Sequence, residues 1–375
     1  MVEHDVLVRG AGAVGLAAAL SLSRQGLRVA LLGTLAEPTQ PDLRAYALNA
    51  ASVRLLEALR VWDAIPADAR TAVHDMHVLG DSPGPGLHFS AWSAAISELA
   101  WIVDAAELEK ALRKAARFAP HVSAVSAEVP ATLQVLAEGR DSVTRARLGV
   151  QWQQQAYGQH ALAARLVSNQ PHAGLARQWF RSPDVLALLP LQTPLFEGRP
   201  GHGLALVWSL PDDRAAELMA LPDAAFNARL NESTHGAAGV LSLVSPRAQW
   251  PLTMARASPL HGPGWVLVGD AAHVVHPLAG QGLNLGLADV ATLAEVVAEA
   301  QAREPWRSLA DPRLLGRYAR VRSGAVSAMA GVTDGLLQLF ASPLPLAKEL
   351  RNRGLSLANR LPPLKRLLMR RAIGA

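Results

Sequence analysis

The sequence predicts an α/β protein with two lobes, in which a sheet-rich lobe is inserted into a first lobe that starts with a strand–helix–strand unit. Three observations support this. The first 33 residues change from strand-like to helix-like and back to strand-like periodicity. The middle of the chain alternates and is dense in Trp, Pro and Gly, whereas the residues from 285 onward repeat mostly with the helical period. A chain of 375 residues also exceeds the usual size of a single hydrophobic core.

The composition is that of a well-buried globular enzyme. Half of the residues are apolar and the mean hydropathy is +0.15, so the chain is not of the disordered class. The absence of cysteine excludes disulfides, thiolate zinc sites and cysteine nucleophiles. The opening MVEHDVLVRG lacks the basic region of a signal peptide, and the apolar run 14–22 is too short to span a membrane. We expect a cytoplasmic protein.

The N-terminal unit consists of HDVLVRG, a glycine-rich turn, a helix and LRVALLG. In such a turn the first glycine permits the tight bend, the second lets a pyrophosphate approach the backbone, and the third lets helix and strand pack closely. The helix N-terminus adds N–H donors and the positive end of its dipole. The pattern predicts a Rossmann-like dinucleotide site formed by Gly10, Ala11, Gly12, Ala13, Val14 and Gly15. The acidic residue that usually ends the second strand is missing, since Gly33 and Thr34 stand there.

The stretch GDAAHVVHPLAGQGLNLGLADV, residues 269–290, links the apolar strand WVLVGD to a long helix. Its glycine amides are expected at the positive end of that helix, which favours an anionic ligand by about 0.3–2 kcal/mol. The candidate cofactor-binding residues here are Gly269, Asp270, Pro277, Gly280, Gln281, Gly282, Leu283 and Asn284. His273 and His276 have no third ligand nearby, so we interpret His273 as orienting the loop by hydrogen bonds and expect no metal.

The net charge of +5 is concentrated at the C-terminus, where residues 343–375 carry eight cationic side chains and one acidic one. Leu364, Leu367 and Leu368 fall on one helical face among them, as in an interfacial helix. Two interpretations stay open: contact with anionic lipid or an acidic partner, or a solvated helix packed on its own domain. The nine tryptophans are scattered rather than interleaved with basic residues, so we expect no nucleic-acid partner.

The 269–290 stretch closely resembles the second flavin motif of the ubiquinone-biosynthesis FAD-dependent hydroxylases, which are aromatic-ring monooxygenases built like para-hydroxybenzoate hydroxylase. The resemblance extends to Asp42-Leu43-Arg44-Ala45, to the segments LALLPL and LVWSLP, and to YARVRSGAVSAMAGVTDGLLQLF. It implies an FAD-binding domain at 1–72, 101–150 and 256–300, a substrate domain at 73–100 and 151–255, and a C-terminal helical region at 301–375.

The resemblance also implies an activity. FAD would be reduced by NAD(P)H and would react with O₂ to give a C4a-hydroperoxyflavin, which hydroxylates a polyprenylated phenol in ubiquinone biosynthesis. Arg44 would approach the flavin cofactor, and Pro277, Leu278 and Ala279 would line its substrate side. The strands around Leu191 and Trp208 would enclose the ring and the start of its tail. The basic C-terminus would suit peripheral contact with the inner face of the cell membrane or with a ubiquinone-biosynthesis complex.

Departures from the family pattern leave other interpretations open. Glu138 replaces the aspartate of the motif Ala-Asp-Gly-x-x-Ser-x-x-Arg, the segment 118–136 is short, and the arginine usual near residue 107 is absent. One alternative is a paralogue with impaired flavin binding that serves as a non-catalytic member of a biosynthetic complex. Another is the same chemistry on an unrelated aromatic substrate. No side chain is assigned as a catalytic acid or base.

Overall fold

The computed structural model describes residues 3–37, 42–80, 86–181, 183–192, 199–275 and 281–341. Several predicted site residues therefore lie outside the described residues, namely Pro277, Leu278, Ala279 and Gly280, together with His276 and the basic tail at 343–375. Within the described residues, no helix combines the length and the apolar character needed to cross a membrane.

The first lobe is built on a six-stranded sheet in which the strands around the N-terminal unit are parallel. Its strands, in sheet order, are β16 (His261–Gly262), β17 (Trp265–Leu267), β9 (Ala131–Leu136), β1 (His4–Arg9), β2 (Val29–Leu32) and β8 (Val122–Val125). Helix α1 (Ala13–Ser23) is buried along almost its whole length because it packs against the sheet and between α4 (Ala105–Phe118) and α8 (Gln281–Arg303). The strand–helix–strand prediction is correct.

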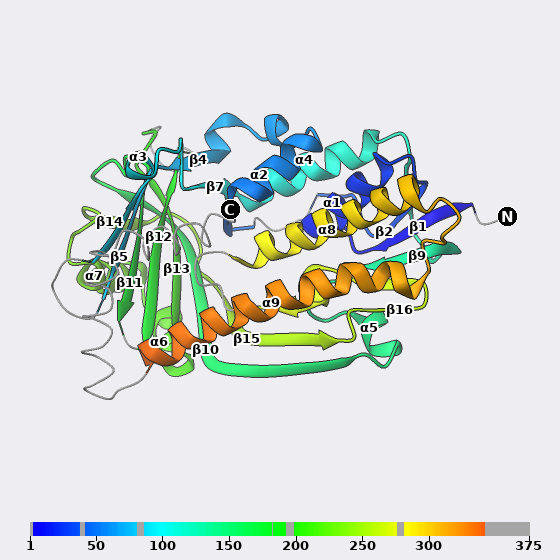
Figure 1. The fold of residues 1–375 in the computed structure, drawn as a ribbon. Helices are drawn as coiled ribbons and strands as arrows, with labels where there is room; N and C mark the ends of the chain where they lie inside the picture. The colour runs from blue at the N-terminus through cyan, green and yellow to red at the C-terminus, as the bar shows by residue number, and fades with distance from the viewer. Residues whose placement is uncertain are drawn as a thin grey trace.

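The second lobe is a nine-stranded sheet, seen on the left of Figure 1. Eight strands follow one path: β18 (His273–Val274), β15 (Ala248–Ser258), β10 (Gln151–Ser168), β13 (Gly203–Pro211), β12 (Asp184–Leu191), β11 (Leu175–Arg181), β5 (Asp75–Leu79) and β6 (Leu87–Ser90). The ninth, β14 (Leu241–Leu243), pairs with β10. Leucines and tryptophans on one face of this sheet form a core with α6 (Asp212–Ala220) and α7 (Asp223–Thr234).

Three features connect the two lobes. A three-stranded sheet of β3 (Ala45–Leu48), β7 (Ala100–Asp104) and β4 (Arg70–Val73) lies where the chain passes between them. The long strands β10 and β15 run together from the large sheet towards α5 (Val143–Arg147). Helix α9 (Pro312–Ala341) packs on α8 and β16 of the first lobe, and its Ser327 accepts a hydrogen bond of 2.8 Å from Arg256 of β15. Figure 1 shows α9 extending from one lobe to the other.

The remaining helical elements are short. They are α2 (Ala50–Ala58), η1 (Trp62–Ala64), η2 (Ala67–Ala69), α3 (Ala91–Ala94) and η3 (Gly269–Ala271). Helix α2 begins after Asn49, whose side chain caps it by accepting a hydrogen bond from Ser52 N.

Candidate cofactor and substrate site

In the glycine turn after β1, Gly10 and Gly15 have no room for a Cβ atom, whereas Gly12 does. Gly10 has a φ of 108°, and a Cβ atom there would lie 2.2 Å from the carbonyl oxygen of Ala137. A Cβ atom on Gly15 would lie 1.9 Å from the carbonyl oxygen of Gly10. A Cβ atom on Gly12 would meet nothing within 4 Å beyond its chain neighbours. Gly12 is also the N-cap of α1, so bare backbone and a helix N-terminus face open space, as a dinucleotide diphosphate requires.

That open space is the end of a cavity of about 750 Å³ that reaches both lobes. The first lobe contributes Gly12, Ala13, Val14, Asp270 and Gly282 to the lining, and the large sheet contributes Ala163, Val207 and Trp250. A flavin held at the glycine turn would therefore share one continuous space with a second molecule over the sheet. The glycine turn and this cavity fit FAD.

Gly33 has a packing reason for being glycine. Its φ is 155°, and a Cβ atom would lie 2.8 Å from the Cβ atom of Ala11 in the glycine turn. The side chain of a glutamate at this position would clash with Ala11 of the glycine turn. Residue 33 therefore has no room for an acidic side chain in this structure.

The second predicted loop begins at Gly269, which takes a left-handed φ of 60° against the side chain of Val14. Asp270 follows in η3 and lines the cavity, where it is an exposed residue. The protein around the cavity displaces part of the water and raises the pKa of the Asp270 carboxyl, against the opposing effects of His273 and Arg44. A carboxylate at this place can accept hydrogen bonds from the hydroxyl groups of a bound cofactor.

Asp289 of α8 holds this loop from behind. Its side chain is fully buried and accepts hydrogen bonds from the Gly269 backbone N–H (2.8 Å) and from Arg322 Nε of α9 (2.6 Å). The His273 ring bonds to the same carboxylate at 2.7 Å. Burial alone would raise the pKa of Asp289, but His273 and Arg322 hold it below its usual range. Sequence reasoning missed this residue, although it is the one acid in the otherwise apolar first part of the helix, LNLGLADV.

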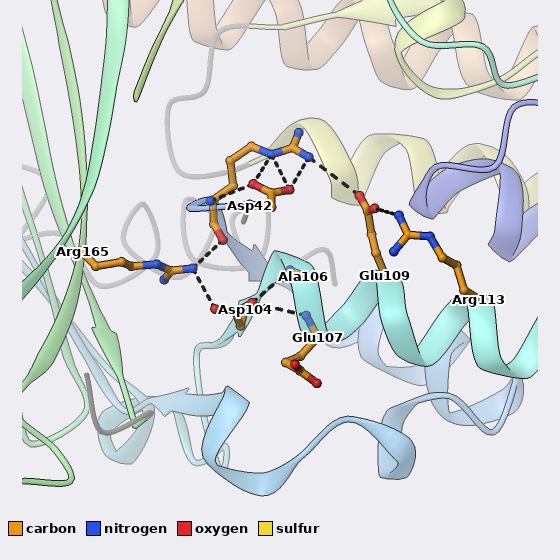
Figure 2. Close-up of polar contacts among 8 residues, drawn as sticks. Asp42, Asp104, Ala106, Glu107, Glu109, Arg113 and Arg165 are labelled. Atoms are coloured by element: carbon orange, nitrogen blue, oxygen red, sulfur yellow. Dashed lines mark hydrogen bonds and ion pairs between the residues drawn. The ribbon is translucent and has the colours of Figure 1, made fainter. Parts of the chain in front are cut away.

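Arg44 lines the cavity and is held by two acids (Figure 2). Its Nε lies 2.9 Å and 3.0 Å from the two carboxylate oxygens of Asp42, and a terminal nitrogen lies 3.7 Å from Glu109 of α4. Glu109 in turn accepts a 2.5 Å hydrogen bond from Arg113. Arg44 is therefore oriented beside the predicted cofactor position by a chain of ion pairs.

An arginine of the other lobe contacts the start of α4. Arg165 of β10 donates to Asp104 (2.8 Å) and to the backbone oxygen of Arg44 (2.9 Å), as Figure 2 shows for the first contact. Asp104 is the N-cap of α4, where it accepts from the N–H groups of Ala106 and Glu107. Sequence reasoning did not find Arg165, because its partners lie 121 and 61 residues away in the chain.

Glu138 forms hydrogen bonds within its own motif. Its carboxylate accepts from Ser142 Oγ (2.5 Å), Thr144 N (3.1 Å) and Thr144 Oγ1 (2.7 Å). Although burial opposes the shift, these bonds lower the pKa of Glu138. Arg145 of the same motif donates to the backbone oxygen of Ala271, which ties the motif to the 269–275 loop.

The start of α8 divides the remaining predicted residues into two groups. Gly282 and Leu283 line the cavity, and a Cβ atom on Gly282 would meet nothing within 4 Å. The Asn284 side chain is 4% exposed and bonds instead to the start of α2, accepting from Asn49 N and Ser52 Oγ and donating to Ala47 O. The side chain of Gln281 is outside the described residues.

The fold and the site define an FAD-dependent monooxygenase. Residues 3–123 and 113–332 match the family described as FAD binding domain, and the chain belongs to this family. It is 32% identical to the ubiquinone hydroxylase UbiL of Rhodospirillum rubrum over 99% of this chain and 89% of that protein. It is 30% identical to the 3-demethoxyubiquinol 3-hydroxylase of Escherichia coli over 99% of this chain and 98% of that protein.

Solved structures share the fold. The Pseudomonas aeruginosa protein PqsL, described as a probable FAD-dependent monooxygenase, superposes with a TM-score of 0.74 at 22% identity over 90% of this chain and 97% of that one. The p-nitrophenol 4-monooxygenase PnpA of Pseudomonas putida gives a TM-score of 0.74 at 18% identity over 99% and 96%. The fold predicted from the sequence is confirmed.

Proposed function

We propose that this protein hydroxylates the aromatic ring of a polyprenylated phenol in ubiquinone biosynthesis, using NAD(P)H and O₂. The observation that carries the proposal is the full-length similarity to two ubiquinone-biosynthesis hydroxylases, joined to a cavity that extends from the glycine turn to the large sheet. Neither the hydrogen bonds of Glu138 nor these relatives favour the non-catalytic alternative.

In this proposal the first lobe holds FAD. The Gly10–Gly15 turn and the α1 N-terminus receive the diphosphate, and Asp270 accepts from the cofactor's hydroxyl groups. Among the described residues, no atom lies within 4 Å of a Cβ position on Gly282, which leaves room there for the flat ring system. When bound, FAD supplies the electron transfer and the oxygen chemistry that no amino-acid side chain offers.

The protein contributes orientation and a dry reaction space. The large sheet lines the cavity mainly with apolar side chains, such as Val185, Leu189 and Val207. Exclusion of water protects oxygen-reactive flavin from wasteful release of H₂O₂. The same walls suit an apolar ring with an isoprenoid substituent.

We further propose that the protein works at the inner face of the cell membrane, where such a substrate resides. Two features support this. The eight cations of residues 343–375 suit an anionic lipid surface. Trp92 of α3 is 92% exposed, a state more typical of an interfacial anchor than of a soluble surface.

The test is product formation by the purified FAD-loaded protein with a short-chain 2-prenylphenol, NAD(P)H and ¹⁸O₂. We expect a product heavier by one ¹⁸O atom, with NAD(P)H consumed in step. Flavin that is reduced and reoxidised without any ¹⁸O in a prenylated phenol, but with ¹⁸O in another aromatic compound, would reassign the substrate. A protein that rejects FAD altogether would contradict the proposal.

A further inference from the structure

One row of residues across the cavity face of the large sheet consists mainly of small side chains. Paired residues cross it in one row: Gln178 of β11 opposite Ala187 of β12, Ala187 opposite Val207 of β13, Val207 opposite Ala163 of β10, and Ala163 opposite Ala248 of β15. All five of these residues line the cavity. The three alanines of the row leave space above the sheet for a ligand, and Gln178 is the one long polar side chain in the row.

Alternation along β11 fixes which way Gln178 points. Trp179 packs in the core beneath the sheet with α6 and α7, so Arg177, two residues before it, has the same direction. Gln178 therefore projects to the opposite side, as its cavity-lining neighbour Ala187 does.

The carboxamide of Gln178 has hydrogen-bonding capacity that the protein does not use. The residue is 9% exposed, and among the described residues its side chain has no hydrogen-bond partner. Its polar atoms are not sealed from the cavity, so a ligand group that pairs with the amide gains a hydrogen bond that the apolar side chains around it do not offer. Ser209 of β13 is another polar side chain of the lining, but its hydroxyl is shorter and it lies outside this row.

We propose that Gln178 is the residue that orients the substrate ring, through a hydrogen bond between its carboxamide and the phenolic oxygen. This rests on the proposed function and goes beyond it by assigning the group that recognises the hydroxyl. The amide has both a donor and an acceptor, so it can accept from a phenol and donate to a phenolate. The space above the three alanines then accommodates the apolar remainder of the molecule.

The test compares binding of a short-chain 2-prenylphenol with binding of the prenylbenzene that lacks the hydroxyl, by calorimetric titration of the FAD-loaded protein. We expect the wild-type protein to favour the phenol by about tenfold, the effect of satisfying a buried polar pair. Gln178→Met keeps the length of the side chain, and the preference should fall to about one. In Gln178→Asn the preference for the phenol should fall in the same way as in Gln178→Met, because the shorter amide does not reach the phenolic oxygen.

A matched control sharpens the result. Gln154→Met makes the same chemical change at an exposed position of β10 and should keep the full preference. In Gln178→Met the fraction of consumed NAD(P)H that yields hydroxylated product should also fall, whereas a purely structural role would lower flavin content instead.

The outcomes separate the two proposals. A wild-type protein that binds no prenylated phenol contradicts both the proposed function and the role of Gln178. A wild-type preference that persists in Gln178→Met or Gln178→Asn overturns only the role of Gln178.

Discussion

At the scale of single residues, the site is defined by which glycines are closed by packing and which are open. Gly10, Gly15 and Gly33 each have backbone or a side chain within 3 Å of a Cβ position, so they are required by the fold. Gly12 and Gly282 have open space at that position and both line the cavity. Substitution at these two residues should therefore change ligand binding without changing packing.

Gly282→Val tests this distinction. The valine should fit the free protein, because nothing lies within 4 Å of the new Cβ, but it should occupy space next to a bound flavin. Crowding of about 1–3 kcal/mol corresponds to an increase in the FAD dissociation constant of about 5- to 150-fold. The measurement is a flavin fluorescence titration, with the thermal midpoint of the FAD-free protein expected to stay constant.

The matched control for this prediction is Gly324→Val. Gly324 is exposed on α9 and also has open space, but it does not line the cavity. The control should bind FAD as the wild type does. Full flavin loading of both variants would show that Gly282 does not border the cofactor.

Glu138 leads to a prediction about pH. Its folded-state pKa is lowered, so its bonds to Ser142 and Thr144 stabilise the fold fully above its ordinary value of 4.5. The contribution is lost as the pH falls through the lowered folded-state pKa. Glu138→Gln should therefore lower the free energy of unfolding at pH 7 by about 1–2 kcal/mol and reduce the loss of stability below pH 4.5.

Denaturant unfolding of Glu138→Gln at pH 7 and below pH 4.5 measures this. Asp141→Asn, at an exposed position of the same segment, should match the wild type at both. If the variant and the wild type lost stability in parallel with falling pH, the carboxylate would not be the source of the effect.

The residue scale also shows how far sequence reasoning reached. The glycine turn, Asp270 and Gly282 were predicted from the local sequence and Arg44 from the family resemblance, and Gly12 of the turn, Arg44, Asp270 and Gly282 all line one cavity. Asp289, Arg165 and Gln178 were not, because their significance depends on partners far away in the chain or on the row formed by four other strands. The resemblance to a family supplied the flavin, which spacing alone left as an unspecified anionic ligand.

At the scale of elements, a buried carboxylate joins α8, α9 and the 269–275 loop. Arg322 of α9 is 6% exposed and donates to Asp289 and to the backbone oxygen of Leu285. Removing one partner of such a buried pair leaves an uncompensated charge, which costs about 3–5 kcal/mol. The position of the loop therefore depends on the packing of two long helices.

Asp289→Asn should lower the free energy of unfolding by about 3–5 kcal/mol, because it removes the charge opposite Arg322 while keeping the shape. FAD affinity should fall with it, since Gly269 loses its charged acceptor. Asp270→Asn is the comparison: its folded-state pKa is raised, so losing that charge should leave stability at pH 7 unchanged or slightly higher. Equal unfolding midpoints for the two variants would refute the role of Asp289.

Long, periodic elements were predictable and short connecting ones were not. The unit β1–α1–β2 and helix α8 follow from 2.0- and 3.6-residue periods that persist over many residues. The sheet of β3, β7 and β4 was missed because each strand has only four or five residues and its paired residues are 27 or more positions apart in the chain. Such pairing is set by how the lobes meet rather than by the local sequence.

At the scale of the whole molecule, the cavity is formed between the two lobes, so contacts that join the lobes also determine its shape. Arg165 is central to this, since it originates on the large sheet and is 5% exposed between Asp104 and the backbone of Arg44. Burial lowers the pKa of the Arg165 guanidinium, while Asp104 opposes the shift. The contact joins the wall of the predicted substrate space to the residue that approaches the cofactor.

Arg165→Met tests whether the contact between the lobes also aligns the two halves of the site. The substitution keeps the length of the side chain but removes the pair with Asp104, so the free energy of unfolding should fall by about 3–5 kcal/mol. Because Arg44 loses its backbone anchor, FAD should bind less tightly, and oxidation of NAD(P)H should yield a smaller fraction of hydroxylated product. Arg256→Met, which removes only the exposed link between β15 and α9, should keep both FAD affinity and coupling. If Arg165→Met lost stability but retained wild-type coupling, Arg165 would stabilise the fold without aligning the two halves of the site.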